Sequence, residues 1–253
     1  MGDPRLAWAL ELCQRVVDLH GRYCGRPILA TGRGAEWAIV GPALLARASY
    51  GVESVLALAE RDTDAAVIVR SVYEASTMFA WMAIDPEKHT ARWWKEDIVQ
   101  RLRTVRELHA LDPKYADRRA SLEAKVKTVA EVPALPRLPQ QAEDADKHWV
   151  EKLPAMLAHG RTSFRGTYSL IYRISSQSAH GLFLPLTAFV QELGGGKFSI
   201  GRPVARIPSL VRVAPYAFGN ALAVASLALG WPTATELDEA FSRAPALDEE
   251  RTT

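Results

Sequence analysis

Residues 62–84 read DTDAAVIVRSVYEASTMFAWMAI, and this stretch decides the fold. Its apolar side chains recur at helical spacing and almost encircle the helix, which is typical of a central helix with neighbours on every side. Two charged residues interrupt it, Arg70 and Glu74, four positions apart and therefore above one another on one helix face. The two residues could form an exposed ion pair within the helix. The apolar surroundings favour a pair held inside the core, where buried ions need a partner: each other, a further polar group or a bound anion.

Helical patterns continue on both sides of this central stretch. They cover residues of about 4–23, 37–60, 86–111, 113–130, 144 onward, 163–180 and 208–230. Asp85-Pro86 and Asp112-Pro113 give start signals, since proline suits the first turn of a helix. No sustained strand alternation and no repeat is visible. The sequence therefore predicts an all-α fold, a single multi-helix bundle of about seven or eight helices.

Two segments break the helical pattern. The prolines between Val132 and Gln141 remove backbone donors and restrict their predecessors, which predicts a surface loop near 132–141. Residues 193–203 are rich in glycine and predict a short hairpin or an ordered loop. We expect one helical domain over 1–245, with a frayed tail at 246–253.

Composition favours a cytoplasmic protein that builds its own core. Of 253 residues, 48% are hydrophobic and 24% charged, and two cysteines are too few for a disulfide scaffold. The start of the chain lacks the basic and apolar regions of a signal peptide. The apolar run 213–231 is expected to be a buried core helix rather than a membrane span, because it contains Pro215 and Asn220.

The net charge of +2 argues against a surface that is basic throughout. Arg101, Arg103 and Arg106 form a run that acidic residues interrupt, which a solvated helix face explains. A second basic patch for an anionic partner could come from residues after 200: Arg202, Arg206 and Arg212.

The stretch 168–181, YSLIYRISSQSAHG, carries most of the potential chemistry. Tyr172, Ser176 and His180 follow one another at four-residue steps and form a polar stripe on one helix face. His180, in the last turn, could act as an acid or base near neutral pH, or could simply cap the helix. If this helix faces residues 62–84, the stripe joins Arg70 and Glu74 in one constellation, with Glu74 within hydrogen-bond reach of His180.

Aromatic and histidine side chains elsewhere allow fewer conclusions. Tryptophans at 81, 93 and 94 could wall a pocket beside this constellation or belong to the core. No partners at metal-ligand spacing accompany four further histidines, His89, His109, His148 and His159. We expect no metal and no cofactor. Ser176 and His180 lack the sharp turn and oxyanion donors of a serine hydrolase.

Arg70-x-x-x-Glu74 and the later Tyr172-x-x-x-Ser176-x-x-x-His180 together resemble a bacterial family of all-helical proteins classed as a domain of unknown function. The resemblance spans about residues 44–180. The arrangement is also loosely similar to the HEPN superfamily, helical bundles with an Arg-x4–6-His motif in a metal-independent ribonuclease site that is often shared across a dimer. Arg173 and His180 match that spacing, whereas Ile174 stands where HEPN nucleases usually have a polar residue.

These features define three hypotheses of function. The first is a HEPN-like, metal-independent ribonuclease of the toxin or phage-defence type, with His180 as acid and base, Arg173 or Arg70 stabilising the phosphate, and Tyr172, Ser176 and Glu74 orienting them. The second is a non-catalytic helical scaffold or regulator. The third is a binder of a small anionic ligand at Arg70. The partners expected are therefore RNA or a small anion, together with a second copy of the chain.

Overall fold

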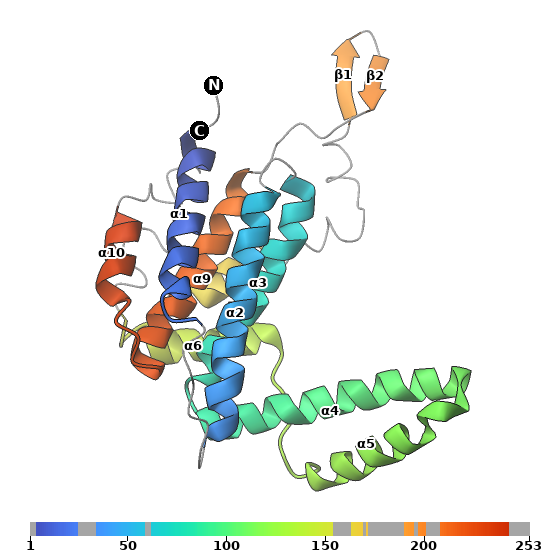
Figure 1. Cartoon of the computed structure of the whole chain (residues 1–253). Coiled ribbons are helices and arrows are strands. Elements are labelled where there is room, and N and C mark those ends of the chain that lie inside the picture. Colours follow the sequence, from blue (N-terminus) through green and yellow to red (C-terminus); the bar gives the residue numbers. More distant parts are fainter. Residues whose placement is uncertain are drawn as a thin grey trace.

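The computed structural model describes residues 4–24, 34–58, 62–153, 163–168, 171, 190–194, 197–200 and 208–242. Four helices run side by side as a bundle: α1 (Pro4–Gly21), α2 (Ala35–Ala57), α3 (Asp62–Met82) and α9 (Pro208–Ala228) (Figure 1). α10 (Ala234–Ser242) packs on α1 and α9, and α6 (Leu138–Trp149) crosses one end of the bundle and packs on α3.

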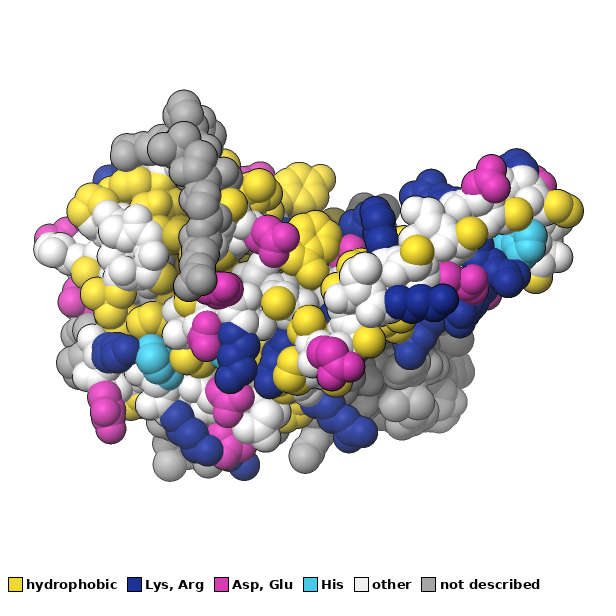
Figure 2. Space-filling view, turned by 90° about the horizontal axis from the view of Figure 1, so that it is seen from below, with side chains coloured by type: hydrophobic (Ala, Val, Ile, Leu, Met, Phe, Trp, Pro, Cys, Tyr) yellow, Lys and Arg dark blue, Asp and Glu magenta, His cyan; other side chains and the backbone are white. Residues whose placement is uncertain are grey.

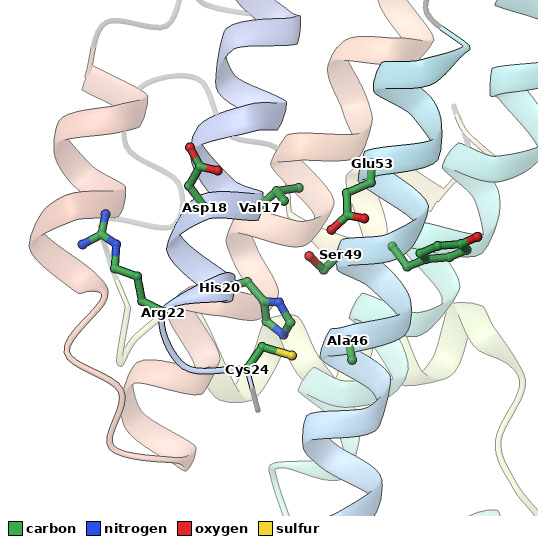
Figure 3. A pocket seen from close by; sticks show the side chains of 10 residues that line it. Val17, Asp18, His20, Arg22, Cys24, Ala46, Ser49 and Glu53 are labelled. Carbon is green, nitrogen blue, oxygen red and sulfur yellow. The ribbon is translucent and has the colours of Figure 1, made fainter. Parts of the chain in front are cut away.

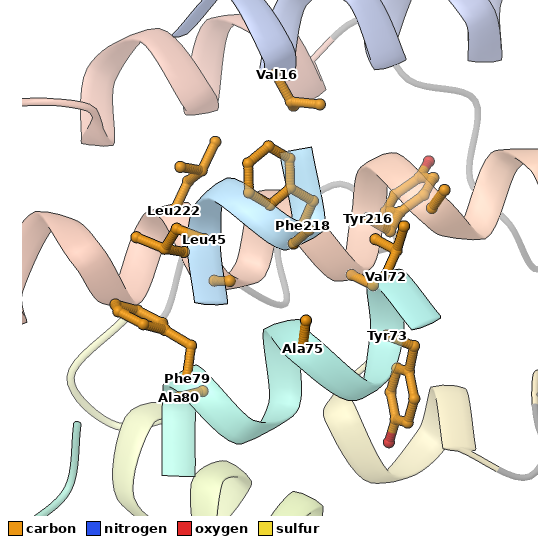
Figure 4. Packing of buried hydrophobic residues seen from close by; sticks show 14 of the residues in the cluster. Val16, Leu45, Val72, Tyr73, Ala75, Phe79, Ala80, Tyr216, Phe218 and Leu222 are labelled. Carbon is orange, nitrogen blue, oxygen red and sulfur yellow. The ribbon is translucent and has the colours of Figure 1, made fainter. Parts of the chain in front are cut away.

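α3 is the central helix that its sequence predicts. It packs on α2, α9 and α6, and its Val72 and Phe79 are fully buried. Figure 4 shows these side chains together with Leu45 of α2, Phe218 of α9 and Val16 of α1. α9 is buried along most of its length, as expected for a core helix. No helix in the described ranges has the length and apolar character needed to cross a membrane.

A helical hairpin projects sideways from the end of the bundle (Figure 1). It consists of α4 (Pro86–Leu111), a short 3-10 helix (Pro113–Tyr115) and α5 (Ala116–Thr128), and we call it the arm. It has a small core of its own, in which Leu102 and Val105 meet Leu122. The arm is therefore held together by its own apolar seam rather than by the bundle.

The start of α4 is fixed to the end of α3. Asp85 caps α4 by accepting a hydrogen bond from the backbone N–H of Lys88 at 3.2 Å. One turn later the His89 ring stacks on Trp81 with centroids 3.7 Å apart, and its Nδ1 donates to the Trp81 carbonyl at 2.7 Å. This anchor sets the direction in which the arm leaves the bundle.

The remaining described elements are a helical stretch at 164–168 and one hairpin. Strands β1 (Val190–Gly194) and β2 (Lys197–Ile200) pair antiparallel, with Val190 opposite Ile200 and a register shift between Glu192 and Gly194. The hairpin occupies the glycine-rich segment in which one was expected. The all-α fold class is confirmed, since this hairpin is the single sheet among the residues described.

The proline-rich loop is shorter than predicted. α6 already begins at Leu138, with Pro139 in its first turn, so the loop ends at Arg137 and not at Gln141. A proline ring costs nothing in a first turn, because the N–H it lacks has no helical partner there. Gln141 is buried, and its side-chain amide donates to the Pro136 carbonyl at 2.7 Å. The expected tail at 246–253 lies outside the described residues.

Candidate functional site

The Arg70–Glu74 ion pair forms as predicted but is not buried as predicted. The guanidinium Nε of Arg70 donates to Oε1 of Glu74 at 2.8 Å. The side chains retain 27% and 42% of their exposure, so both remain in contact with water. The expectation of a sealed ionic core at this position is therefore wrong. α4 turns away from α2 and α3 after its first turns, and the gap that opens exposes this face of α3.

That gap is an elongated groove of about 510 Å³ between α2, α3 and the first turns of α4. Its walls are mostly apolar, and its lining residues are Ile39, Val40, Ala43, Leu44, Arg47, Ser71, Glu74, Ala75, Met78, Trp93 and Trp94. The volume lies within the range of small-molecule pockets. The groove thus combines an apolar interior with a small number of polar groups.

Two tryptophans from α4 form one wall of the groove. The rings of Trp93 and Trp94 lie edge to face, with centroids 5.0 Å apart and planes at 69°. They were considered as pocket walls on sequence grounds, and the structure places both there. Trp81 does not join them, because it is fully buried and stacks on His89.

Arg47 of α2 and Glu74 of α3 are the charged residues of the lining. Glu74 is neutralised by Arg70, whereas Arg47 is exposed and forms no ion pair within the described part of the chain. Sequence reasoning missed Arg47, although the signal that revealed Arg70, a charge within an otherwise apolar helical run, is present at Arg47 too. Among the described residues, the groove therefore has one positive charge, that of Arg47, without an acidic partner.

The beginning of the predicted 163–180 helix does pack against α3. The hydroxyl of Tyr73 donates to the Phe164 carbonyl at 2.5 Å, and the Tyr73 and Tyr168 rings lie 6.4 Å apart. Asp146 caps this stretch by accepting from the backbone N–H groups of Phe164 and Arg165, both at 2.9 Å. Burial raises the pKa of Tyr73 and also that of Asp146.

The catalytic candidates Tyr172, Arg173, Ser176 and His180 lie outside the described residues. The contact between Glu74 and His180 thus stays a prediction. Glu74 lines the groove, and Tyr73 contacts the 164–168 stretch on another side of α3. Helical periodicity places Arg70 between these two sides.

A second hollow, of about 670 Å³, lies where α1 ends beside α2. Figure 3 shows the His20 ring and the Cys24 thiol pointing into the same space, with Ser49 and Glu53 on α2 across from them. His20 is buried against Phe218 and Trp231, and this burial lowers its pKa. Residues 25–33 follow directly and are not described. Within the described residues, no three His, Cys, Asp or Glu side chains are grouped as a metal site requires.

The exposure of the ion pair leads to a prediction about stability. Glu74→Gln is expected to change the free energy of unfolding by less than about 1 kcal/mol, because partly solvated ion pairs contribute little. A sealed pair would have cost about 3–5 kcal/mol. Urea denaturation measures the free energy of unfolding. The matched control is Glu11→Gln, which removes the carboxylate of a similar ion pair with Arg15 on α1. A loss above about 3 kcal/mol for Glu74→Gln alone would contradict the exposed geometry.

Comparison with known proteins identifies one family. A family model described as "Family of unknown function (DUF5677)" matches residues 39–198. No curated protein matches the chain, and no solved structure matches it. All residues that line the α2–α3–α4 groove fall within the matched segment. The second hollow is lined in part by residues that precede the matched segment, among them His20 and Cys24. The groove is therefore the better candidate for a site that belongs to the family fold.

Proposed function

The chain belongs to DUF5677, a helical family of unknown function, and we propose that it binds a small molecule with an apolar body and an anionic group in the α2–α3–α4 groove. The observation that carries this proposal is that Arg47, which forms no ion pair among the described residues, lies beside a groove walled by Trp93, Trp94 and Met78. The bound anion is the third hypothesis drawn from the sequence, now placed at Arg47 rather than at Arg70.

The charge expected of the ligand follows from the charged side chains in and beside the groove. Arg70 offsets Glu74. Arg47 has no acidic partner among the described residues. Arginine presents several N–H donors in a plane and binds carboxylates or phosphates through two parallel hydrogen bonds. An anionic ligand therefore completes the pairing that the protein leaves open, whereas a cationic ligand would meet the guanidinium.

The apolar body of the ligand follows from the walls. Indole rings offer large flat surfaces, and the thioether of Met78 adapts its shape to whatever lies against it. Ile39, at 60% exposure, extends the apolar surface at the rim. A flat aromatic acid meets all of these requirements, since its ring can stack on the tryptophans while its carboxylate reaches Arg47.

Three probes of nearly equal shape test the proposal. Isothermal titration with naphthalene-2-carboxylate should give saturable binding to one site. The neutral naphthalene-2-methanol should bind at least tenfold more weakly, about 1.4 kcal/mol, because it lacks the charge that Arg47 pairs with. The cationic naphthalene-2-methylamine should bind more weakly still. Equal affinity for all three would contradict an anion site.

Variants place the binding in the groove. Arg47→Ala should weaken naphthalene-2-carboxylate about tenfold, and Trp93→Ala should weaken all three probes. Glu74→Gln should leave binding of the acid equal or tighter, because it removes a negative charge from the lining. Arg118→Ala on α5 is a matched loss of one arginine and should have no effect. If Arg47→Ala and Arg118→Ala behave alike, the groove is not the site.

A second candidate function is a HEPN-like, metal-independent ribonuclease of the toxin or phage-defence type. The observation in its favour is that Arg173 and His180 lie seven residues apart, nearly two helical turns, and so share one face that can hold a phosphate. In this candidate His180 transfers the proton of the attacking 2′-hydroxyl, Arg173 stabilises the phosphorane, and Tyr172 and Ser176 orient them. A homodimer would complete the site, as in HEPN nucleases.

Cleavage of single-stranded RNA tests this second candidate. Purified protein should leave a 2′,3′-cyclic phosphate, and EDTA should not stop the reaction. His180→Ala and Arg173→Ala should each lower cleavage about 10²-fold or more while circular dichroism shows an unchanged helical fold. Light scattering measures whether the active species is a dimer. Equal trace activity in the wild type and in His180→Ala would mean contamination and would leave the ligand binder or the non-catalytic scaffold.

A further inference from the structure

The arm carries a larger positive net charge than the chain as a whole. Residues 86–128 contain eleven lysines and arginines but seven aspartates and glutamates, a net charge of +4, while the whole chain has a net charge of +2. Figure 2 shows Lys and Arg side chains spread along the arm, with fewer Asp and Glu among them. The sequence pattern alone suggested an interrupted run on a solvated face.

Five of these cations fall on one side of α4. We call them the basic row: Lys88, Arg92, Lys95, Arg103 and Arg106. They are spaced four, three, eight and three residues apart, which keeps them within one strip of a helix that turns every 3.6 residues. Glu96 and Glu107, four residues after Arg92 and Arg103, border that strip, and no acidic residue of α4 lies within it. With a rise of 1.5 Å per residue, the row is about 27 Å long.

The partners of the row leave its charge largely uncompensated. Arg106 shares the single carboxylate of Glu123 with Arg119, at 3.1 and 3.2 Å. Lys95 donates to the backbone carbonyls of Ala130 and Val132, which are neutral. Lys88 and Arg103 are exposed and form no ion pair among the described residues. A single small anion cannot neutralise a row of this length, but a polyanion can.

We propose that the basic row binds the phosphate backbone of a nucleic acid. Nucleic acids present closely and regularly spaced charges along a line, and lysines and arginines that replace their counterions gain affinity. An anionic membrane fits less well, because a helix that lies on a bilayer must insert its apolar face. In the arm that face is already covered, since Leu102 and Val105 of α4 pack on Leu122 of α5.

The basic row lies on the arm, and the proposal that it binds nucleic acid uses neither the groove residues nor His180. Fluorescence anisotropy of the full-length protein with labelled 20-nucleotide RNA and DNA strands of the same sequence measures the binding. DNA lacks the 2′-hydroxyl needed for cleavage, so binding to it does not depend on the ribonuclease candidate. Binding of both strands indicates backbone contact, and binding of RNA alone indicates a phosphate site with an added 2′-hydroxyl contact.

Two double variants that lose the same number of positive charges test whether the basic row is responsible for binding nucleic acid. Lys88→Gln with Arg103→Gln should weaken binding roughly tenfold and reduce the slope of log K against log salt by about 1.4 to 1.8, as for two lost phosphate contacts. Arg118→Gln with Lys125→Gln removes the same charge from two exposed residues of α5 that are not part of the basic row, and it should change neither. Binding of naphthalene-2-carboxylate should be the same in both.

Three outcomes would overturn the proposal. The first is no binding to RNA or DNA at 50 mM salt. The second is an equal effect of the two double variants, which would mean that net charge and not the row is recognised. The third is equal or tighter binding to phosphatidylserine vesicles or to polyglutamate than to the nucleic acid strands, in which case the partner is a membrane or an acidic protein.

Discussion

Trp149→Ala is expected to lower the free energy of unfolding by about 3–5 kcal/mol, the range for large buried aromatic residues. Trp149 is 4% exposed, and its indole Nε1 donates to the Ala80 carbonyl at 2.8 Å. This one side chain holds α6 against the C-terminal half of α3. Its loss removes the apolar contact and leaves a cavity at the same time, and guanidinium denaturation followed by circular dichroism measures the loss.

Trp149→Phe is the matched control for this experiment. It keeps an aromatic ring between α6 and α3 but lacks the indole N–H, so it should cost less than half as much. A loss of less than 1 kcal/mol for Trp149→Ala would contradict the packing of α6 on α3. The 164–168 stretch would then be in question too, because Asp146 of α6 caps it.

The second large effect concerns the close approach of α2 and α3. A Cβ atom at Gly51 would lie 2.5 Å from Cγ2 of Val72, closer than such atoms approach. Gly51→Ala should therefore destabilise the protein by about 1–3 kcal/mol through overpacking, despite the better helix propensity of alanine. This contact makes Gly51 a point of close packing between the two helices. Because α2 and α3 form two sides of the groove, their spacing also sets its width.

A double-mutant cycle separates this clash from other effects of the substitution. Val72→Ala alone should destabilise by removing buried methyl groups. Combined with Gly51→Ala, it makes room for the new Cβ, so the two changes together should cost at least 1 kcal/mol less than the sum of the single changes. Strict additivity would contradict the close contact. Gly21→Ala, where no atom lies within 4 Å of an added Cβ, controls for the general effect of the substitution.

Much of the fold could be predicted because local signals specify it. Asp85-Pro86 gave the start of α4 correctly, since the cap is made by Asp85 itself. Pro139 misled the prediction of α6, because the same ring that stops a helix interior is tolerated in its first turn. In residues 62–84, apolar side chains occur on almost every side of the helix. This pattern correctly predicted a central helix, since such a helix needs neighbours on every side.

The candidate site was less predictable because it depends on how distant segments meet. The ion pair of Arg70 and Glu74 follows from spacing along one helix, but its exposure follows from the direction of α4. The start of α4 is held to the end of α3 by the stacking of His89 on Trp81, a contact that no local sequence pattern predicts. Trp93 and Trp94 could equally have entered the core. Arg47 and this wall come together only in the folded chain, because they line one groove from two different helices.

Fluorine NMR of protein labelled with 5-fluorotryptophan tests the groove most directly. The chain has seven tryptophans, and Trp93→Phe and Trp94→Phe assign the two resonances of the wall. On addition of naphthalene-2-carboxylate, the account predicts that these two resonances shift, that Trp8 and Trp231 do not, and that Arg47→Ala weakens the response. Unmoved Trp93 and Trp94 resonances at saturating probe, or shifts confined to tryptophans far from the groove, would contradict the claim that the α2–α3–α4 groove is the binding site.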